Sequence, residues 1–442
     1  MSFRTEKDPL GEKQVPADAL YGIQTLRAVE NYPISGLRPL AGFVEAVVMI
    51  KRSAAVVHKH TGRLEAAYAD AIIQAADEVL AGQHRDQFVV DPYQAGARTS
   101  HNMNCNEVLA NRANEILGAA RGAYAPVHPN DHVNMAQSTN DVIPTAMRLG
   151  TLRALPKLLA SLDQLAEAFL AKGKQFDHVM KSGRTHLQDA TPIRLGQEFT
   201  AYGHTVARHR AKLAQAADWL RPMNIGGSAV GTGINVEVVY PGLMVTEMSR
   251  LSGVALEVSS DRIQLMQSMG DIATFSGAMR AFVLDLCKIA DDIRLLASGP
   301  RTGLAEIILP AVQPGSSIMP GKINPSIAEM VNQVCYQLLG FDTTVAMAAK
   351  AGELELNVMM PVITHNVLFG MEILSNTARV FAEKCISGIE ADEAMCAHWL
   401  ERSPALVTAL MPKIGYAESA KLSKEALATG KTVKQLVTDK KV

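Results

Sequence analysis

The stretch GSSIMPGKINP, residues 315–325, interrupts a largely apolar, helix-like chain with residues that could form little core. Its prolines prevent a helix from continuing, and its glycines permit φ > 0 and act as hinges. We therefore predict a loop here, followed by a helix over 326–349. The loop carries a hydroxyl at Ser316, a cation at Lys322 and an amide at Asn324. This combination indicates binding of an anionic substrate rather than a plain surface turn.

The composition limits the classes of protein to which the chain could belong. With 442 residues and 48% hydrophobic content, it can bury a large core. Lys and Arg (43) nearly balance Asp and Glu (44), so no basic face favours nucleic acid and no polybasic run favours a membrane. Five scattered cysteines without a CxxC motif are typical of reduced thiols, and the charged N-terminus is no signal peptide. We expect a soluble, cytoplasmic protein.

Apolar residues recur at helical spacing along most of the chain, whereas aromatic residues make up only 5%. Helical patterns cover residues 41–60, 64–82, 146–173, 194–220, 271–297, 326–350 and 352–388. We predict a mainly α fold with a central long-helix bundle over 139–394, an N-terminal mainly helical domain over 1–138 and a small C-terminal helical domain over 395–442. The pattern over 271–297 is apolar around so much of the helix that several neighbours must cover it, which predicts a homo-oligomer.

Islands of short polar side chains interrupt these helices at residues 99–106, 138–140 and 185–186, in addition to the loop. Helix starts offer unpaired N–H groups that suit a carboxylate, although Thr99 or Ser100 alone would be read as plain N-caps. The islands contain no acid pair for glycoside hydrolysis, no GxSxG, no HExxH and no redox motif. They supply neutral donors and one lysine, which stabilise negative charge on a carboxylate.

Other motifs point away from nucleotides and metals. The glycine-dense stretch 223–235 has no GKS/T and no GxGxxG register, so it predicts close helix approach or N–H donation to an anion. The two histidines of 128–132 have no third ligand at suitable spacing, so we expect no metal.

Removing a proton from the carbon next to a carboxylate gives an enediolate, whose charge needs several fixed donors. A mobile lid that carries a serine alkoxide would suit this step, because it brings a strong base and excludes water. A free serine does not ionise at neutral pH. The Ser316 oxyanion would therefore need N–H groups of its own loop, with Lys322 as a further partner.

The loop 315–325 resembles the signature loop of the aspartase/fumarase superfamily. The segment TEKDPLGEKQVPADALYGIQTLRAVENYPISG (5–36) resembles the aspartase branch, since fumarases usually carry tryptophan where Tyr21 stands. MVNQVCYQLLGFDTTVAMAAKAGELELNV (330–358) also resembles aspartases, whereas HPNDHVNMAQSTND (128–141) and GRTHLQDATP (183–192) are similar to both branches. The resemblance covers nearly the whole chain. It implies an aspartase/fumarase-type fold, and a homotetramer with composite active sites that converts L-aspartate to fumarate and ammonia without a cofactor.

The resemblance also implies roles for individual residues. Ser316 would be the base, with His186 and Lys322 as the other catalytic groups. The β-carboxylate would be held by Thr99, Ser138, Thr139 and Ser317, and the α-carboxylate by Thr185, Lys322 and Asn324. Asn140 and His186 would face the amino group, and Glu329 would support His186 from behind.

Two residues depart from the aspartase pattern, namely Arg98 in place of glycine and Met360 in place of glutamate. The extra guanidinium at Arg98 could select another substituted succinate or serve only the surface. Fumarate hydratase is the nearest alternative function. A catalytically silent structural protein, such as a lens crystallin recruited from a lyase, is the alternative from another class. Loss of Ser316 or Lys322 would favour it, but both are present.

Overall fold

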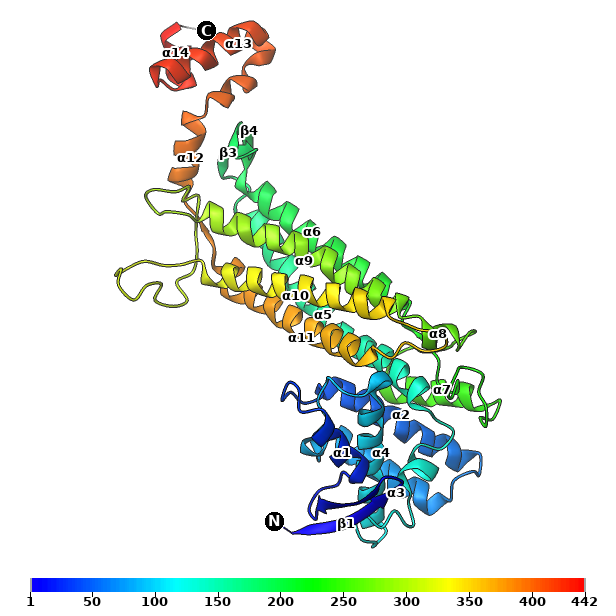
Figure 1. Cartoon of the computed structure of the whole chain (residues 1–442). Helices are drawn as coiled ribbons and strands as arrows, with labels where there is room; N and C mark the ends of the chain where they lie inside the picture. The colour runs from blue at the N-terminus through cyan, green and yellow to red at the C-terminus, as the bar shows by residue number, and fades with distance from the viewer. Residues whose placement is uncertain (1, 441–442) are drawn as a thin grey trace. The chain divides into compact units, whose positions relative to one another are not determined.

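The computed structural model describes residues 2–440, and most of them lie in helices (Figure 1). The helices are α1 (Ile23–Asn31), α2 (Ala41–His60), α3 (Ala66–Leu80), α4 (Thr99–Ile116), α5 (Thr139–Gln175), α6 (Leu195–Asp218), α7 (Tyr240–Ser252), α8 (Gln264–Gln267), α9 (Gly270–Leu296), α10 (Ser326–Lys350), α11 (Met360–Lys384), α12 (Glu393–Arg402), α13 (Met411–Thr429) and α14 (Val433–Lys440). Short helical turns are η1 (Arg85–Gln87), η2 (Gly96–Arg98), η3 (Pro129–Val133), η4 (Ile386–Gly388) and η5 (Pro404–Ala409). The predicted mainly α fold is confirmed.

The strands form small two-stranded sheets. The antiparallel pairs are β1 (Phe3–Asp8) with β2 (Gly11–Pro16), β3 (Met180–Thr185) with β4 (Gln188–Arg194), and β7 (Ile307–Ile308) with β8 (Glu390–Ala391). The pair β5 (Pro222–Met223) with β6 (Glu257–Val258) is parallel. Across the described residues, no helix combines the length and the apolar character needed to cross a bilayer.

The chain forms two compact units, each assembled from segments that are distant in sequence. The first unit comprises the chain through Leu158, Lys212–Arg280 and Leu338–Ile373. The second comprises Leu159–Ala211, Ala281–Gln337 and the chain from Leu374 onward. The long helices α5, α6, α9, α10 and α11 each contribute residues to both units. The division into domains 1–138, 139–394 and 395–442 stays a prediction.

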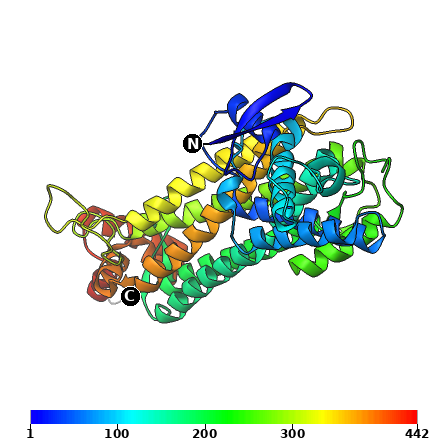
Figure 2. The same cartoon turned by 90° about the horizontal axis from the view of Figure 1, so that it is seen from below.

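In the first unit, α2 packs against α3 and α7, and α3 packs against α4. Figure 1 and Figure 2 both show the blue and cyan segments gathered together, and Figure 1 labels the green helix α7 beside them. The apolar face predicted for α2 is buried, with Val47, Val48 and Ile50 fully inaccessible to solvent. Burial of such side chains contributes roughly 1.5–3 kcal/mol each, so α2 anchors the elements around it.

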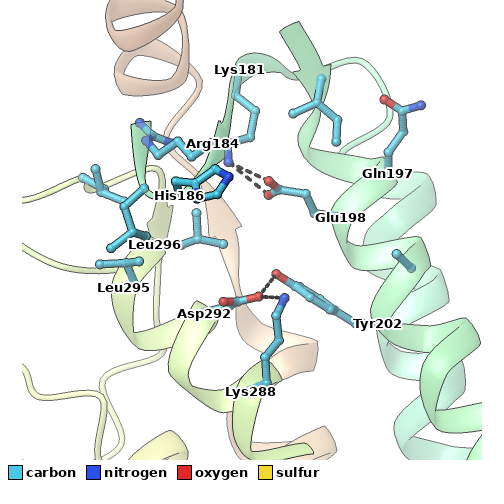
Figure 3. A pocket seen from close by; sticks show the side chains of 14 residues that line it. Lys181, Arg184, His186, Gln197, Glu198, Tyr202, Lys288, Asp292, Leu295 and Leu296 are labelled. Atoms are coloured by element: carbon cyan, nitrogen blue, oxygen red, sulfur yellow. Dashed lines mark hydrogen bonds and ion pairs between the residues drawn. The ribbon is translucent and has the colours of Figure 1, made fainter. Parts of the chain in front are cut away.

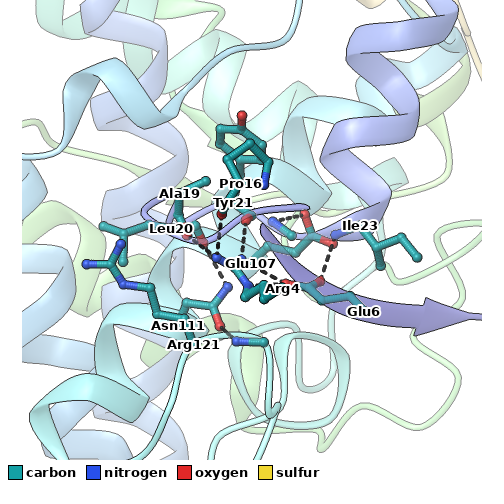
Figure 4. A network of polar contacts seen from close by, with 12 residues as sticks. Arg4, Glu6, Pro16, Ala19, Leu20, Tyr21, Ile23, Glu107, Asn111 and Arg121 are labelled. Carbon is teal, nitrogen blue, oxygen red and sulfur yellow. Dashed lines mark hydrogen bonds and ion pairs between the residues drawn. The ribbon is translucent and has the colours of Figure 1, made fainter. Parts of the chain in front are cut away.

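Two buried carboxylates join the N-terminal hairpin β1–β2, helix α1 and helix α4 (Figure 4). Glu6 accepts a hydrogen bond from the Ile23 N–H at 2.8 Å and pairs with Arg4 at 2.7 Å. Glu107 of α4 accepts from the Gly22 and Gln24 N–H groups, each at 2.9 Å. This hairpin was not predicted from the sequence, because its strands are short and half of their residues are charged. Two carboxylates therefore satisfy the otherwise unpaired N–H groups at the start of α1.

In the second unit, aromatic rings from three helices form the centre of the core. Phe169 of α5 lies against Phe199 and Tyr202 of α6 and against Phe381 of α11, with ring centroids 5.7–6.2 Å apart. A second, smaller core lies among the C-terminal helices, where Val407, Leu422, Ala426, Val433 and Leu436 are buried.

Helix α9 has the broad apolar face that its sequence predicts. All the residues of that face are buried, namely Phe275, Met279, Phe282, Val283, Leu286, Ile289, Ala290, Ile293 and Leu296. Leu284 and Leu295 remain 53% and 42% exposed. These two side chains lie on the outer side of α9, whose inner face is already covered. Exposed apolar groups of this kind suit contact with a further chain.

Three predictions need correction. The polar island at 185–186 lies at the end of the hairpin β3–β4, which was not predicted. Helix α5 begins at Thr139, so it includes the polar island and continues through Gly173. Helix α11 begins at Met360 rather than near 352, because the side chain of Asn357 donates to the Ala348 carbonyl and ends α10 in a turn. Within residues 2–440, all five cysteines are free thiols.

Candidate active site

The first unit brings the starts of α4 and α5 together. The Asn102 side-chain amide, one turn into α4, donates to the Thr139 hydroxyl oxygen at 3.2 Å. In the described chain, α4 has no side-chain N-cap, so the reading of Thr99 or Ser100 as a cap is wrong. Thr99 is exposed and Thr139 is half-buried. Two helix N-termini therefore present neutral donors side by side, an arrangement that favours a carboxylate.

Ser138 and Asp141 form a capping box at the start of α5. The Asn140 N–H donates to the Ser138 hydroxyl oxygen at 3.2 Å, and the Ser138 N–H donates to Asp141 at 2.9 Å. This exchange fixes the backbone of the island in the helical direction. The Asn140 side-chain nitrogen donates to the Ala229 carbonyl at 2.8 Å, so its Oδ1 is left to face a donor such as an ammonium group.

The glycine-dense segment 223–235 donates N–H groups to an anion, as its sequence predicts, and this anion is the protein's own Asp141. The Gly226 and Ser228 N–H groups each donate to Asp141 Oδ2 at 3.0 Å. Gly226 has φ +84° and would place a Cβ 2.6 Å from the Pro241 ring, so glycine is required there. Burial raises the pKa of Asp141 to about 6, although Ser138, Ser228 and Gly226 donate to it.

We expect Asp141 to make the free energy of unfolding depend on pH. Because its pKa is about 6 in the folded chain and 3.8 as a free side chain, its contribution is fully present below pH 3.8 and is lost as the pH rises through 6. The difference in unfolding free energy between the wild type and Asp141→Asn should therefore fall by about 3 kcal/mol at most between pH 4 and 7. Denaturant titrations across this range measure it, and a constant difference would contradict the assignment.

Arg98 lies directly before Thr99, and its side chain is buried rather than on the surface. The guanidinium is 1% exposed and lies 4.0 Å from the centroid of the Phe43 ring. Among residues 2–440, its Nε and Nη1 atoms have no hydrogen-bond partner. Burial lowers the pKa of Arg98 to about 9. Arg98 has φ +68°, a conformation that glycine adopts without strain and that other residues adopt rarely. A purely surface role for Arg98 is excluded.

Met360 is fully buried at the first position of α11. A glutamate there would bury a carboxylate at a cost of several kcal/mol unless it were paired, of the order expected for desolvating an ion. The methionine therefore suits the apolar surroundings that this structure has.

In the second unit, the predicted loop 315–325 forms the later part of the segment 309–325, which connects β7 to α10. The Ser316 hydroxyl oxygen accepts hydrogen bonds from the Ile318 N–H at 3.3 Å and the Met319 N–H at 2.9 Å. These are the kind of loop donors that an ionised serine needs, since backbone N–H groups stabilise an oxyanion without reorganising. Ser317 and Lys322 are exposed, and Ile318 is 82% exposed.

The base of this loop is closed by a tight contact at Gly315. A Cβ on Gly315 would lie 2.2 Å from the Lys322 carbonyl oxygen and 2.8 Å from the Asn324 N–H. The Asn324 side chain also donates to the Gly315 carbonyl. The positive φ predicted for both glycines occurs at Gly321, at +79°, whereas Gly315 is required for close approach. Asn324 therefore has a structural role in the loop besides any contact with substrate.

Thr185 and His186 lie at the tip of the hairpin β3–β4. Thr185 pairs with Gln188, and both intervening residues, His186 (φ 58°) and Leu187 (φ 59°), adopt left-handed backbone conformations. Such a turn matches the twist of a two-residue hairpin but costs about 1–2 kcal/mol per residue when glycine is absent. The strain is consistent with a functional tip, which presents His186 on the exposed end of the hairpin.

A cavity of about 520 Å³ lies beside this hairpin, between β3–β4, α6 and α9 (Figure 3). His186 lines it together with charged groups that already have partners. Lys181 donates to Glu198 at 2.9 Å and lies 2.9 Å from Glu306, and Tyr202 donates to Asp292 at 2.8 Å. Lys288 also pairs with Asp292. Since these cations are already neutralised by carboxylates, this cavity is a poor site for a dicarboxylate.

Within each unit, the structure thus collects part of the predicted set. The first unit holds Thr99, Ser138, Thr139 and Asn140 at two helix starts, and the second holds Thr185, His186, Ser316, Ser317, Lys322, Asn324 and Glu329 on a hairpin, a loop and the first turn of α10. Support of His186 by Glu329 stays a prediction. Asn102 and Asp141 were given no role on the basis of the sequence. Their positions three residues after Thr99 and Ser138, on the same helix faces, were the available signal.

Comparison with known proteins gives the same classification over the whole chain. A family model described as lyase matches residues 11–340, and one described as fumarase C C-terminus matches residues 406–442. The chain is 47% identical over 434 residues to an aspartate ammonia-lyase from Bacillus subtilis, covering 98% of this chain and 91% of that protein. It is 48% identical over 439 residues to a class II fumarate hydratase from Halobacterium salinarum, covering 99% and 93%.

The fold also matches solved structures. A cobalt-bound crystal structure described as fumarate lyase:delta crystallin, from Brucella melitensis, superposes with a TM-score of 0.97 at 48% identity, covering 100% of this chain and 96% of that one. A class II fumarase from Schistosoma mansoni superposes with a TM-score of 0.96 at 35% identity, covering 99% and 95%. With its signature loop, its paired helix starts and these relatives, the chain belongs to the aspartase/fumarase superfamily of lyases.

Proposed function

We propose that this protein is an aspartate ammonia-lyase, which converts L-aspartate reversibly to fumarate and ammonia. The observation that carries the proposal is the joining of the α4 and α5 starts by the Asn102–Thr139 hydrogen bond. It supplies fixed neutral donors for a carboxylate that becomes doubly charged during the reaction. The aspartate ammonia-lyases among the relatives, at 42–48% identity over nearly the whole chain, support the choice of substrate.

In this mechanism Ser316, as the alkoxide, takes the Cβ proton of aspartate. The electron pair of the C–H bond enters the β-carboxylate, which becomes an enediolate held by Thr99, Ser138, Thr139 and Ser317. The pair then forms the C=C bond as the Cα–N bond breaks, and ammonia leaves with the electrons of that bond. None of these steps requires a metal or an organic cofactor.

The other site residues hold the far end of the substrate. Thr185, Lys322 and Asn324 bind the α-carboxylate. Asn140 Oδ1 accepts from the substrate ammonium, because the nitrogen of its amide is already engaged with Ala229. His186 faces the same group from the hairpin tip. We further propose a cytoplasmic homotetramer in which each site collects islands from different subunits, because the exposed apolar side chains on α9 suit contact with another chain.

Fumarate hydratase is the second candidate, favoured by the 48% identity to the Halobacterium salinarum protein. Both reactions share the enediolate and differ only in the leaving group. Formation of fumarate is followed by its ultraviolet absorbance, with aspartate, malate or another substituted succinate as the sole substrate. We expect turnover of aspartate. Turnover of malate without aspartate would establish the hydratase, and turnover of another succinate that is abolished in Arg98→Gly would assign the specificity to Arg98.

A further inference from the structure

Lys51 of α2 is a fully buried cation whose hydrogen-bond acceptors are amide oxygens. Its Nζ donates to Asn134 Oδ1 at 2.8 Å and to Gln137 Oε1 at 2.9 Å, and its side chain is 0% exposed. Desolvating an ammonium group is costly, so a lysine that is buried inside a domain without a bonded carboxylate points to a functional constraint. Burial lowers the pKa of Lys51 to about 8.

The acceptors of Lys51 lie in the turn that leads into the candidate carboxylate site. Asn134 and Gln137 belong to the segment between η3 and Ser138, the N-cap of α5. The Asn134 side-chain nitrogen donates to the Gln137 carbonyl at 3.2 Å, and the Gln137 side-chain nitrogen donates to the Val133 carbonyl at 3.2 Å. Lys51 thus holds both side chains that shape this turn.

A chain of hydrogen bonds continues from Lys51 to the Thr139 hydroxyl. Asn134 Oδ1, which accepts from Lys51, also accepts from the Asn102 side-chain nitrogen at 3.3 Å. The same Asn102 nitrogen donates to the Thr139 hydroxyl oxygen at 3.2 Å. These hydrogen bonds therefore connect α2 to the starts of α4 and α5, from Lys51 through Asn134 and Asn102 to Thr139.

The direction of this chain follows from the chemistry of its first member. An ammonium group has only donors, so the atom of Asn134 that faces Lys51 must be its oxygen. That oxygen turns the nitrogen of Asn102 toward it and toward Thr139. Since the Thr139 oxygen then accepts from Asn102, the hydrogen of the hydroxyl is left to point at a bound ligand. A substrate carboxylate, which has only acceptors, is the ligand that this direction selects.

The ionisable groups around Lys51 leave its charge in place. Asp141 attracts it but has Ser138, Gly226 and Ser228 N–H groups as its own donors. Burial raises the pKa of the Cys105 thiol to about 12, so that group is neutral. Burial, with the nearby charges of Arg98 and Lys51, lowers the pKa of His101 well below its usual value, so the imidazole is neutral too. At pH 7, Lys51 and Arg98 are positive and Asp141 is negative, so these three side chains have a net charge of +1 behind the site.

We propose that Lys51 is a positioning residue for the reaction: through Asn134 and Asn102 it makes the Thr139 hydroxyl a hydrogen-bond donor to the substrate carboxylate. This inference rests on the proposed function, because it assigns the Thr139 site to a carboxylate. Asn102 and Asn134 act in it only as relays. A neutral amine at position 51 could also accept a hydrogen bond, and the direction of the chain would then no longer be determined.

The test compares Lys51→Met, which removes the donors, with Lys51→Arg, which keeps a donor-only side chain. Lys172→Met is the matched control, because Lys172 is also buried and donates to an amide and a carbonyl, Gln175 Oε1 at 2.8 Å and Ile389 O at 2.7 Å. Within residues 2–440, the hydrogen bonds of Lys172 go to Gln175 and Ile389 and not to a predicted site residue. Its loss should lower stability without weakening ligand binding.

Binding of succinate, a dicarboxylate without a leaving group, is measured by calorimetry alongside kcat and KM for aspartate. We expect Lys51→Met to bind succinate about 10–100-fold more weakly and to lose a similar factor in kcat/KM, as for the loss of a charge-assisted hydrogen bond. Lys51→Arg should recover most of both. The wild-type kcat/KM should fall above pH 8, a decline that Lys51→Met lacks and Lys51→Arg moves to higher pH.

Wild-type succinate affinity and an unchanged pH profile in folded Lys51→Met would overturn the proposal. If Lys51→Met fails to fold, Asn102→Leu removes the last link while keeping Lys51, and it should weaken succinate binding about 10-fold or more. Unchanged succinate affinity in that variant would overturn the proposal equally. If the wild type binds succinate but does not turn over aspartate, the proposed function fails while the succinate comparison still decides the role of Lys51.

Discussion

Replacing Ser316 with alanine should reduce kcat by about 1,000-fold or more, since the reaction loses the base that takes the Cβ proton. The Ser316 oxygen accepts from the Ile318 and Met319 N–H groups, which stabilise its ionised form. No neighbouring side chain in the loop is available as a comparable base, because Lys322 is proposed to bind the α-carboxylate and the Asn324 amide is not a base. The KM for aspartate should change little, since the carboxylate-binding residues remain.

The matched variant is Ser317→Ala, which removes the adjacent hydroxyl from the same loop. Ser317 is proposed to bind the β-carboxylate, so its loss should raise KM and lower kcat by about 10–100-fold, a smaller loss than that of the base. Steady-state kinetics with aspartate measures both variants, and circular dichroism checks that each remains folded. A Ser316→Ala enzyme with turnover within 10-fold of wild type would remove Ser316 from the role of base.

The sequence predicted the helices well where apolar spacing was regular. The bounds predicted for α2 and α10 match the structure, and the apolar face predicted for α9 is buried in full. Prediction from the sequence failed where contacts between distant residues decide the local structure. The hairpin β1–β2 is held by Arg4 and Glu6, whose partners include Pro16, Ile23 and the distant Tyr124 hydroxyl, and its charged residues carry no apolar signal.

The candidate site was predictable as a set of residue types but not as a geometry. Short polar residues before a helix start indicate donors, so Ser138, Thr139 and Asn140 could be found. The direction of the Thr139 hydrogen bond could not, because it depends on Lys51, 88 positions before Thr139 in the chain. Likewise, the left-handed backbone at Arg98, which precedes an α4 without a side-chain N-cap, could not be predicted, because a positive φ is uncommon for residues other than glycine.

Replacing Glu107 should destabilise the first unit more than any other single carboxylate described above. Its side chain is 1% exposed and accepts from the Gly22, Gln24 and Thr25 N–H groups and from the Thr25 hydroxyl at 2.6 Å. Glu107→Leu has a similar volume but leaves these donors buried and unpaired. We expect a loss of about 3–5 kcal/mol in the free energy of unfolding, as when one partner of a buried charged network is removed.

Glu115→Gln is the matched control, because Glu115 lies on the same helix but is partly exposed, and it pairs with Arg112 and Arg121. Its loss should cost at most about 1 kcal/mol, since solvent screens such pairs. Denaturant unfolding followed by circular dichroism compares the variants, and hydrogen exchange of the α1 amides tests the cause. In Glu107→Leu, exchange should accelerate in α1 first, because the carboxylate satisfies the N–H groups at that helix start. Equal losses for Glu107→Leu and Glu115→Gln would show that α1 is held by its apolar contacts rather than by this carboxylate.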